Sequence, residues 1–231
     1  MMKAVIFDMF ETLITHYNSP VYFGTQMAMD AGIPAEEFLP MWRSTEQERT
    51  LGIYTVDEVV ADILKQTSRY REELVNLIVD KRKNVTKNCF QNLHPEILPM
   101  LNALKKQGIK IGLISNCFSE EAQEIRESIL FSYFDAVCLS YEEGVRKPDE
   151  EIYHRCLSRL GLQMDECIYV GDGGSFELET ARKLGMHAFQ AAWYLKEGTN
   201  QPSKRKADFV HLETPLELLN YLERDKDNGN I

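Results

Sequence analysis

The sequence predicts an α/β protein in which helices cover both faces of a parallel sheet and an all-helical segment follows the first strand. Three observations lead to this prediction. Short, continuous apolar runs recur along the chain, as in strands that are buried on both faces. Helical patterns alternate with these runs, which is typical of parallel sheets. Between residues 15 and 90 the apolar runs stop, and only amphipathic helical patterns occur.

Six apolar runs predict the strands of the sheet. In chain order they are Ala4–Phe7, Ile109–Ile114, Ala136–Leu139, Cys167–Val170, Met186–Phe189 and Asp208–His211. Helical patterns lie between and after them, at Pro95–Lys106, Glu120–Leu130, Asp149–Leu160, Phe176–Leu184 and Pro215–Leu222. Three of these helices are followed by Gly108, Gly161 or Gly185. Glycine commonly closes a helix because it adopts left-handed backbone angles without strain.

The segment after the first strand predicts a separate helical unit. Four amphipathic patterns fill it, at Pro20–Ala31, Pro34–Glu48, Val56–Gln66 and Arg71–Lys87. We therefore expect a core domain made of residues 1–14 and 91–231, and a helical domain made of residues 15–90. A chain of 231 residues is long enough for this arrangement.

Composition excludes several classes of function. The net charge of −10 argues against a nucleic-acid partner, which requires a surplus of Lys and Arg. No apolar stretch is long enough to predict a membrane helix. The five cysteines are scattered and match no zinc spacing, which is typical of proteins in a reducing compartment. Since no signal-like segment begins the sequence, we expect a cytoplasmic location.

Polar side chains follow four of the predicted strands, where parallel sheets bind their ligands. They are Asp8 after the first, Ser115 and Asn116 after the second, Lys147 after the third, and Asp172 and Glu177 after the fourth. A carboxylate can act as a nucleophile towards phosphorus or an activated carbon. Several carboxylates together form a hard oxygen site suited to Mg²⁺, which would screen an anionic substrate. A hydroxyl, an amide and an ammonium can hold the transferring group.

These four motifs, in this order, resemble those of the haloacid dehalogenase-like hydrolases, a superfamily dominated by phosphatases. The resemblance covers nearly the whole chain and implies a Rossmann-like core with a small helical cap. It implies that Asp8 is the nucleophile and a metal ligand, and that the backbone carbonyl of Phe10 also binds the metal. Ser115 and Lys147 would hold the transferring group with help from Asn116. Asp172 would bind Mg²⁺, and Glu177 would bind it directly or through water.

The sequence departs from the phosphatase pattern at Phe10. Phosphatases of this superfamily carry an Asp there, which protonates the leaving group, and its loss typically costs about 10²–10⁴-fold in rate. A phosphatase could compensate with water, Glu11 or a cap residue. The 2-haloacid dehalogenases also lack this Asp, but they usually lack the metal site too. A phosphonate-cleaving enzyme would need a cap lysine, of which Lys65 is the first. A catalytically weak binding or regulatory protein is the remaining reading.

Arg49 is the best candidate for a substrate contact in the helical segment, because a guanidinium can clamp a carboxylate or phosphate. It could equally form a surface ion pair with Glu46 or Glu48. The prediction is therefore a Mg²⁺-dependent hydrolase that acts on a small phosphorylated substrate, with no nucleic-acid or membrane partner. We expect a monomer or a homodimer.

Overall fold

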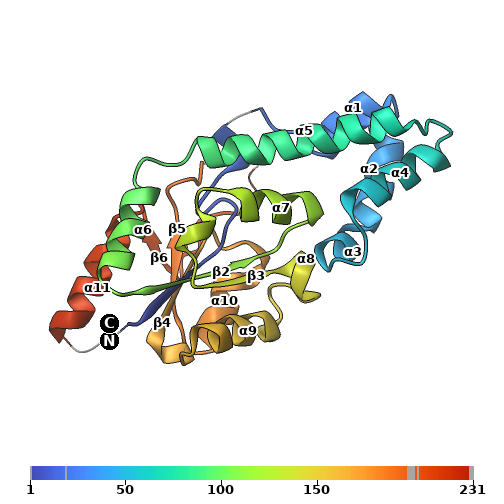
Figure 1. Ribbon diagram of the computed structural model, residues 1–231. Helices are drawn as coiled ribbons and strands as arrows, with labels where there is room; N and C mark the ends of the chain where they lie inside the picture. Colours follow the sequence, from blue (N-terminus) through green and yellow to red (C-terminus); the bar gives the residue numbers. More distant parts are fainter. Residues whose placement is uncertain (1, 19, 197–200, 202, 229–231) are drawn as a thin grey trace.

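The computed structural model describes residues 2–18, 20–196, 201 and 203–228 (Figure 1). Its centre is a six-stranded sheet in which every pair of neighbouring strands is parallel. The strands are β1 (Ala4–Phe7), β2 (Lys110–Ser115), β3 (Ala136–Leu139), β4 (Cys167–Gly171), β5 (His187–Ala191) and β6 (Val210–Leu212), in the order β3-β2-β1-β4-β5-β6. All six predicted strands are present, which confirms the predicted fold class.

Alternate residues of β1 point to opposite faces of the sheet, as the period of a strand requires. Val5 and Phe7 enter one apolar cluster, and Ala4 and Ile6 enter the other. All four side chains are fully buried. Both faces are covered, which explains why β1 is a continuous apolar run in the sequence.

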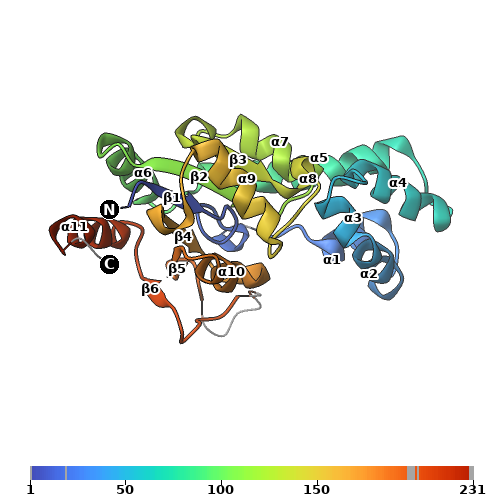
Figure 2. The same cartoon turned by 90° about the horizontal axis from the view of Figure 1, so that it is seen from below.

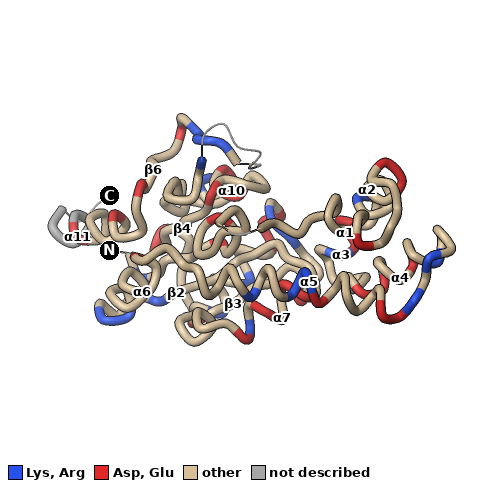
Figure 3. Tube along the Cα trace, turned by 90° about the horizontal axis from the view of Figure 1, so that it is seen from above, with Lys and Arg blue, Asp and Glu red and all other residues tan. Residues whose placement is uncertain are grey.

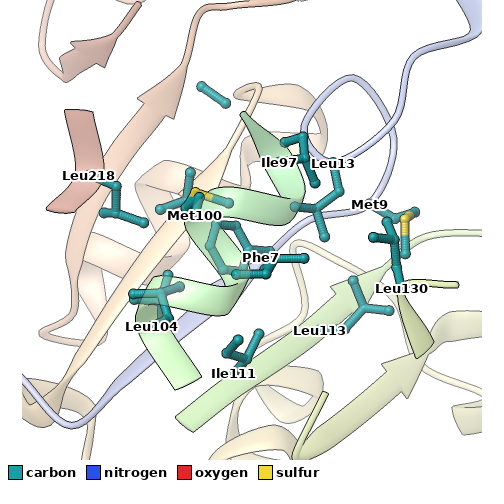
Figure 4. Close-up of a cluster of buried hydrophobic side chains, with 14 of the residues drawn as sticks. Phe7, Met9, Leu13, Ile97, Met100, Leu104, Ile111, Leu113, Leu130 and Leu218 are labelled. Atoms are coloured by element: carbon teal, nitrogen blue, oxygen red, sulfur yellow. The ribbon is translucent and has the colours of Figure 1, made fainter. Parts of the chain in front are cut away.

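Helices of the core domain lie on both faces of the sheet (Figure 2). The cluster around Phe7 includes side chains of α6 (Ile97–Lys106), α7 (Ser119–Glu127) and α11 (Glu217–Asn228). Figure 4 shows this cluster, in which Phe7 lies between Met100 of α6 and residues of β2. The opposite cluster is formed by α9 (Glu150–Leu160) and α10 (Glu177–Lys183).

The segment between β1 and α6 folds as helices that extend away from the sheet (Figures 1 and 2). They are α1 (Gly24–Ala31), α2 (Ala35–Ser44), α3 (Glu46–Thr50), α4 (Val56–Gln66) and α5 (Glu72–Gln91). They have an apolar core of their own, with Met27, Phe38 and Ile78 fully buried. The long α5 returns the chain to the core domain and runs beside α7.

The single helix expected over Pro34–Glu48 is wrong, because the chain breaks at Thr45 between α2 and α3. The hydroxyl groups of Ser44 and Thr45 donate to the carbonyls of Met41 and Trp42. Such side-chain bonds compete with the helical backbone ladder. The other predicted helices are present with shifted ends. Among the described residues, no helix is long and apolar enough to cross a bilayer.

The strand order places the predicted site residues at one edge of the sheet. β1 lies at the centre, between β2 and β4, and Phe7 is level with Leu113 and Val170. Asp8 extends this register, since its N–H donates to the Val170 carbonyl at 2.9 Å. The chain therefore leaves β1, β2 and β4 at the same edge, with Asp8, Ser115 and Asp172 close to these strand ends.

Candidate active site

Asp8 lies at the carboxyl end of β1 in contact with Lys147. The Lys147 ammonium donates to Asp8 Oδ1 at 2.5 Å and also binds Glu177 Oε2. Asp8 is 6% exposed and Lys147 is 3% exposed. The structure thus brings together residues that are 139 positions apart in the sequence.

Three carboxylates gather around this ammonium. Oxygen atoms of Asp8, Asp172 and Glu177 lie within 4.8 Å of one another, and all three residues are buried. The Tyr169 hydroxyl donates to Glu177 Oε2 at 2.9 Å, and the Gly173 N–H donates to Glu177 Oε1 at 3.1 Å. These two bonds fix the Glu177 carboxylate in place.

The glycine-rich backbone of the loop after β4 lies close to these carboxylates. A Cβ atom at Gly171 would lie 2.0 Å from Glu177 Oε1, so any larger residue there would displace the Glu177 carboxylate. Gly173 has a φ of 94°, and its neighbour Gly174 donates its N–H to Asp172 Oδ1 at 2.9 Å. Ser175 and Phe176 also have positive φ angles, of 51° and 53°. The turn directs Asp172 and Glu177 towards the same point.

The cluster carries more negative than positive charge. Burial raises the pKa of Asp8 well above its usual range, and the neighbouring Glu177 carboxylate adds to the shift. Burial, followed by Glu177, raises the pKa of Asp172 to about 7. Burial opposes the charged form of Lys147, but Asp8 and Glu177 outweigh it and raise the pKa of the ammonium. One ammonium therefore faces three buried carboxylates.

These residues fit a divalent metal ion. Carboxylate oxygens are the ligands that Mg²⁺ prefers, and a second cation would balance the charge that Lys147 leaves unpaired. Asp8, Asp172 and Glu177 are the residues that could hold it. In the part of the chain that the structure describes, no other group of His, Cys, Asp and Glu side chains meets the same geometry.

Ser115 and Asn116 follow β2 at the same edge, and they differ in their bonding. The Ser115 hydroxyl is fully buried, and the described residues offer it no hydrogen-bond partner. A buried hydroxyl of this kind is costly unless a ligand satisfies it. Asn116 instead binds the backbone of Lys147: it accepts from the Lys147 N–H at 2.8 Å and donates to the Lys147 carbonyl at 3.0 Å.

Phe10 and Glu11 lie on the loop after Asp8. The ring of Phe10 stacks on His16, with ring centroids 5.0 Å apart and an interplanar angle of 12°. The Glu11 carboxylate accepts from the Thr15 hydroxyl at 2.5 Å and from the His16 N–H at 3.0 Å. Glu11 is therefore held by its own loop, which weakens its candidacy as a replacement acid.

Arg49 lies apart from the cluster around Lys147. It is 1% exposed, so the surface ion pair with Glu46 or Glu48 is wrong. Its guanidinium lies 3.5 Å from the centre of the Trp42 ring and 4.7 Å from that of Phe118, and it donates to the Trp42 carbonyl. In this conformation Arg49 joins the helical segment to the loop after β2. Its predicted contact with substrate stays a prediction.

Lys65 does not lie at the site either. Its side chain is 57% exposed on α4, where it faces Asp62. This position gives no support to a phosphonate-cleaving enzyme that depends on Lys65 as its reactive lysine.

A cavity of about 230 Å³ lies between the core domain and the helical segment. Its lining comes from the loops after β1, β2, β3 and β4 and from α3 and α7, and consists of Phe10, Glu46, Thr50, Asn116, Cys117, Phe118, Glu121, Arg146 and Ser175. Because Phe10 and Asn116 also adjoin Asp8 and Lys147, this cavity is the natural place for a substrate.

The sequence did not reveal two residues of the site. Tyr169 belongs to the apolar run of β4, and only its hydroxyl contact with Glu177 identifies it. Arg146 lines the cavity, and its sole sequence signal is its place directly before Lys147. Neither signal is specific without the fold.

Comparison with known proteins gives a consistent result. A family model described as haloacid dehalogenase-like hydrolase matches residues 2–185. A glyceraldehyde 3-phosphate phosphatase of Methanocaldococcus jannaschii is 25% identical over 80% of this chain and 83% of its own length. A phosphoglycolate phosphatase of Aquifex aeolicus is 27% identical over 91% of this chain and 96% of its own length.

Solved structures share the fold at lower identity. A haloacid dehalogenase-like phosphatase of Thermococcus onnurineus has a TM-score of 0.65 at 21% identity, over 96% of this chain and 98% of its own. A 2-haloacid dehalogenase of Pseudomonas syringae has a TM-score of 0.68 at 22% identity, over 97% of this chain and 99% of its own. Since both chemistries occur on this fold, the fold alone does not separate them.

Proposed function

The chain belongs to the haloacid dehalogenase-like hydrolases, and from this premise we propose that it is a Mg²⁺-dependent phosphohydrolase with Asp8 as its nucleophile. One observation carries the proposal. Asp8 lies at the end of β1 with two further carboxylates and an ammonium around it. The phosphatases among its relatives support a small phosphorylated substrate.

The first step is attack of an Asp8 carboxylate oxygen on the phosphorus atom of a phosphate ester. A phosphorus–oxygen bond to Asp8 forms, and the bond to the leaving oxygen breaks. Mg²⁺, when bound by the carboxylates of Asp8, Asp172 and Glu177 and by the backbone carbonyl of Phe10, would supply positive charge that favours ionised Asp8 and screens the phosphoryl group. The Ser115 hydroxyl, for which no described residue is a hydrogen-bond partner, donates to a phosphoryl oxygen.

Lys147 and Asn116 complete the phosphoryl site. The Lys147 ammonium is held at Asp8, where it can also bind an oxygen of the transferring group. Asn116 fixes the backbone of Lys147 from both sides and so keeps the ammonium in place. Water then hydrolyses the aspartyl phosphate and restores Asp8, which splits one difficult displacement into two easier ones.

The leaving group of the first step has no acid at position 10 to protonate it. Phe10 cannot exchange a proton, and Glu11 is bound by its own loop. We therefore expect the highest turnover with esters that have good leaving groups, or with esters whose leaving oxygen takes a proton from water.

Phe10 also favours the second candidate, a 2-haloacid dehalogenase, because halide leaves without a proton. The carboxylate cluster opposes this candidate, since displacement of halide by Asp8 needs no divalent metal. A binding or regulatory protein without turnover is the third candidate. The retained contact between Asp8 and Lys147 opposes it.

We assign residues 15–90 as a cap over the site and residues 1–14 and 91–231 as the core domain. Support comes from α3, whose residues Glu46 and Thr50 line the cavity together with the loop after β2.

The five cysteines are buried free thiols, which fits the cytoplasmic location that we propose.

The test is a screen of phosphate esters and 2-haloacids, each with and without Mg²⁺, on the parent protein and on Asp8→Asn. We expect turnover of phosphate esters that is lost in chelator and in Asp8→Asn, while circular dichroism shows the fold intact. Asp62→Asn, at an exposed position of α4, is the matched control and should retain full activity. Full activity in chelator with a 2-haloacid would instead establish the dehalogenase.

A further inference from the structure

Arg146 has a fixed backbone beside the site. It directly precedes Lys147, whose N–H and carbonyl both bind the side chain of Asn116. The Arg146 carbonyl accepts from the Asp149 N–H at 2.9 Å. The loop that carries Arg146 is thus tied to the same residue that follows β2, and the base of its side chain is fixed relative to Asp8.

Arg146 lines two cavities. One is the cavity of about 230 Å³ that Phe10 and Asn116 also line. The other, of about 450 Å³, is lined by Gln47 and Leu51 beside the core loop that carries Arg146. Arg146 is half-buried, so part of its side chain remains accessible to a ligand that enters between α3 and the core domain.

Arg146 is the cation that these cavities leave available. Among the described residues it has no ion-pair partner, and the other charged residues lining the two cavities are the carboxylates Glu46, Glu121 and Asp149. Glu121 is already engaged, since it accepts from Arg82 at 3.3 Å. Lys147 binds Asp8 and Glu177 and is not among the residues that line these two cavities.

The charge of the whole protein makes such a cation useful. Acidic residues outnumber Lys and Arg by 36 to 26, and Figure 3 shows the two signs interspersed over both the core domain and the helical segment. An anionic leaving group entering a carboxylate-lined cleft is repelled unless a local positive charge receives it.

We propose that Arg146 selects phosphate esters whose leaving group carries a carboxylate, an inference that rests on the proposed phosphohydrolase. The phosphoryl group binds at Asp8, and the carboxylate at the other end of the substrate binds the guanidinium of Arg146 in a fork of two hydrogen bonds. The small volume next to Phe10 restricts the substrate to a short carbon chain.

The experiment compares two esters of the same size that differ at one group. 3-Phosphoglycerate carries a carboxylate where glycerol 3-phosphate carries a neutral hydroxymethyl group. We expect the parent protein to prefer 3-phosphoglycerate in kcat/KM. Arg146→Gln should reduce that preference by about 10- to 100-fold, the range for loss of a charge-assisted pair, with glycerol 3-phosphate little affected.

Two variants sharpen the comparison. Arg146→Lys keeps the charge but not the fork and should retain part of the preference. Arg71→Gln, at an exposed position at the start of α5, is the matched control and should behave as the parent. Propane-1,3-diol bisphosphate, which has the same short chain, tests whether a second phosphate is the preferred anion instead.

Three outcomes would overturn the inference. The first is equal kcat/KM values for the two esters in the parent. The second is an equal decrease in kcat/KM on both esters in Arg146→Gln. The third is a decrease in kcat/KM in Arg146→Gln that is as large for the bisphosphate as for 3-phosphoglycerate. Each leaves the phosphohydrolase in place, because turnover of an aryl phosphate, whose leaving group needs no acid, still reports on Asp8. A parent that hydrolyses no phosphate ester overturns the proposed function, and the inference with it.

Discussion

The Lys147 ammonium lies 2.5 Å from Oδ1 of Asp8, and it reaches Glu177 at the same time. A single lysine thus balances part of the charge of three buried carboxylates. A phosphoryl oxygen or a metal ion that enters the site would compete with this ammonium for the same space beside the carboxylates. The contact makes Lys147 both a partner of the proposed nucleophile and a competitor of the proposed cation.

Lys147→Met should therefore separate turnover from metal binding. Loss of the ammonium removes a charge from the phosphoryl site, and we expect kcat to fall by about 100-fold or more. Mg²⁺ should bind at least as tightly as in the parent, because the three carboxylates lose their competing cation. Steady-state kinetics and calorimetric titration with Mg²⁺ measure the two effects.

The control for this variant is Lys183→Met, whose lysine is 75% exposed and pairs with Glu150 on the surface. It should change neither quantity. Weaker Mg²⁺ binding in Lys147→Met would contradict the assignment of Asp8, Asp172 and Glu177 as the metal ligands.

The sequence predicted the sheet well because the physical signal is local. A strand buried on both faces must be apolar at every position, and Ala4–Phe7 meets this requirement with four fully buried residues. The same reasoning placed Asp8, Ser115 and Asp172 at one sheet edge, and the structure has them there. The family match confirms the resemblance drawn from the motifs, while the roles of the individual residues stay predictions.

The directions of individual side chains could not be predicted from the sequence. Nothing near Arg49 in the chain indicates that its guanidinium stacks on Trp42 and on Phe118, which is 69 residues away. Likewise, Glu11 could point to the site or to its own loop, and only the fold shows the second. These choices depend on tertiary packing, for which sequence patterns carry no specific signal.

The metal-free protein should lose stability as the pH rises from about 5 to about 7. The folded state raises the pKa of Asp172 to about 7 from an ordinary value of 3.8. Between these values the folded state holds a proton that the unfolded state has released, so unfolding is favoured as the pH rises. Asp8 shifts in the same direction.

Scanning calorimetry in chelator at about pH 5 and about pH 7.5 measures this effect, and we expect the Tm to fall by a few degrees. Mg²⁺ should raise the Tm most at the higher pH, because it stabilises the ionised carboxylates. In Asp172→Asn the decrease in Tm between the two pH values should be smaller than in the parent. A Tm that rises with pH in chelator would contradict the prediction.

Phe10→Asp should raise turnover of esters with poor leaving groups. Phe10 lines the cavity and stacks on His16, at the loop position where the resemblance to the phosphatases of the superfamily predicts an Asp. A protonated carboxyl group there can donate to the leaving oxygen, which is worth up to about 10²–10⁴-fold for an alkoxide. An aryl phosphate, whose leaving group is already stable, should gain little.

Phe10→Asn is the matched control, because it has the shape of Asp but cannot donate an acidic proton. The measurement is the ratio of kcat/KM values for an alkyl and an aryl phosphate in the parent and in both variants. We expect the ratio to rise only in Phe10→Asp, and to rise more at acidic pH, where the new carboxyl group is protonated. Equal ratios in the Asp and Asn variants would mean that the ring of Phe10 does not stand where a general acid can reach the leaving oxygen.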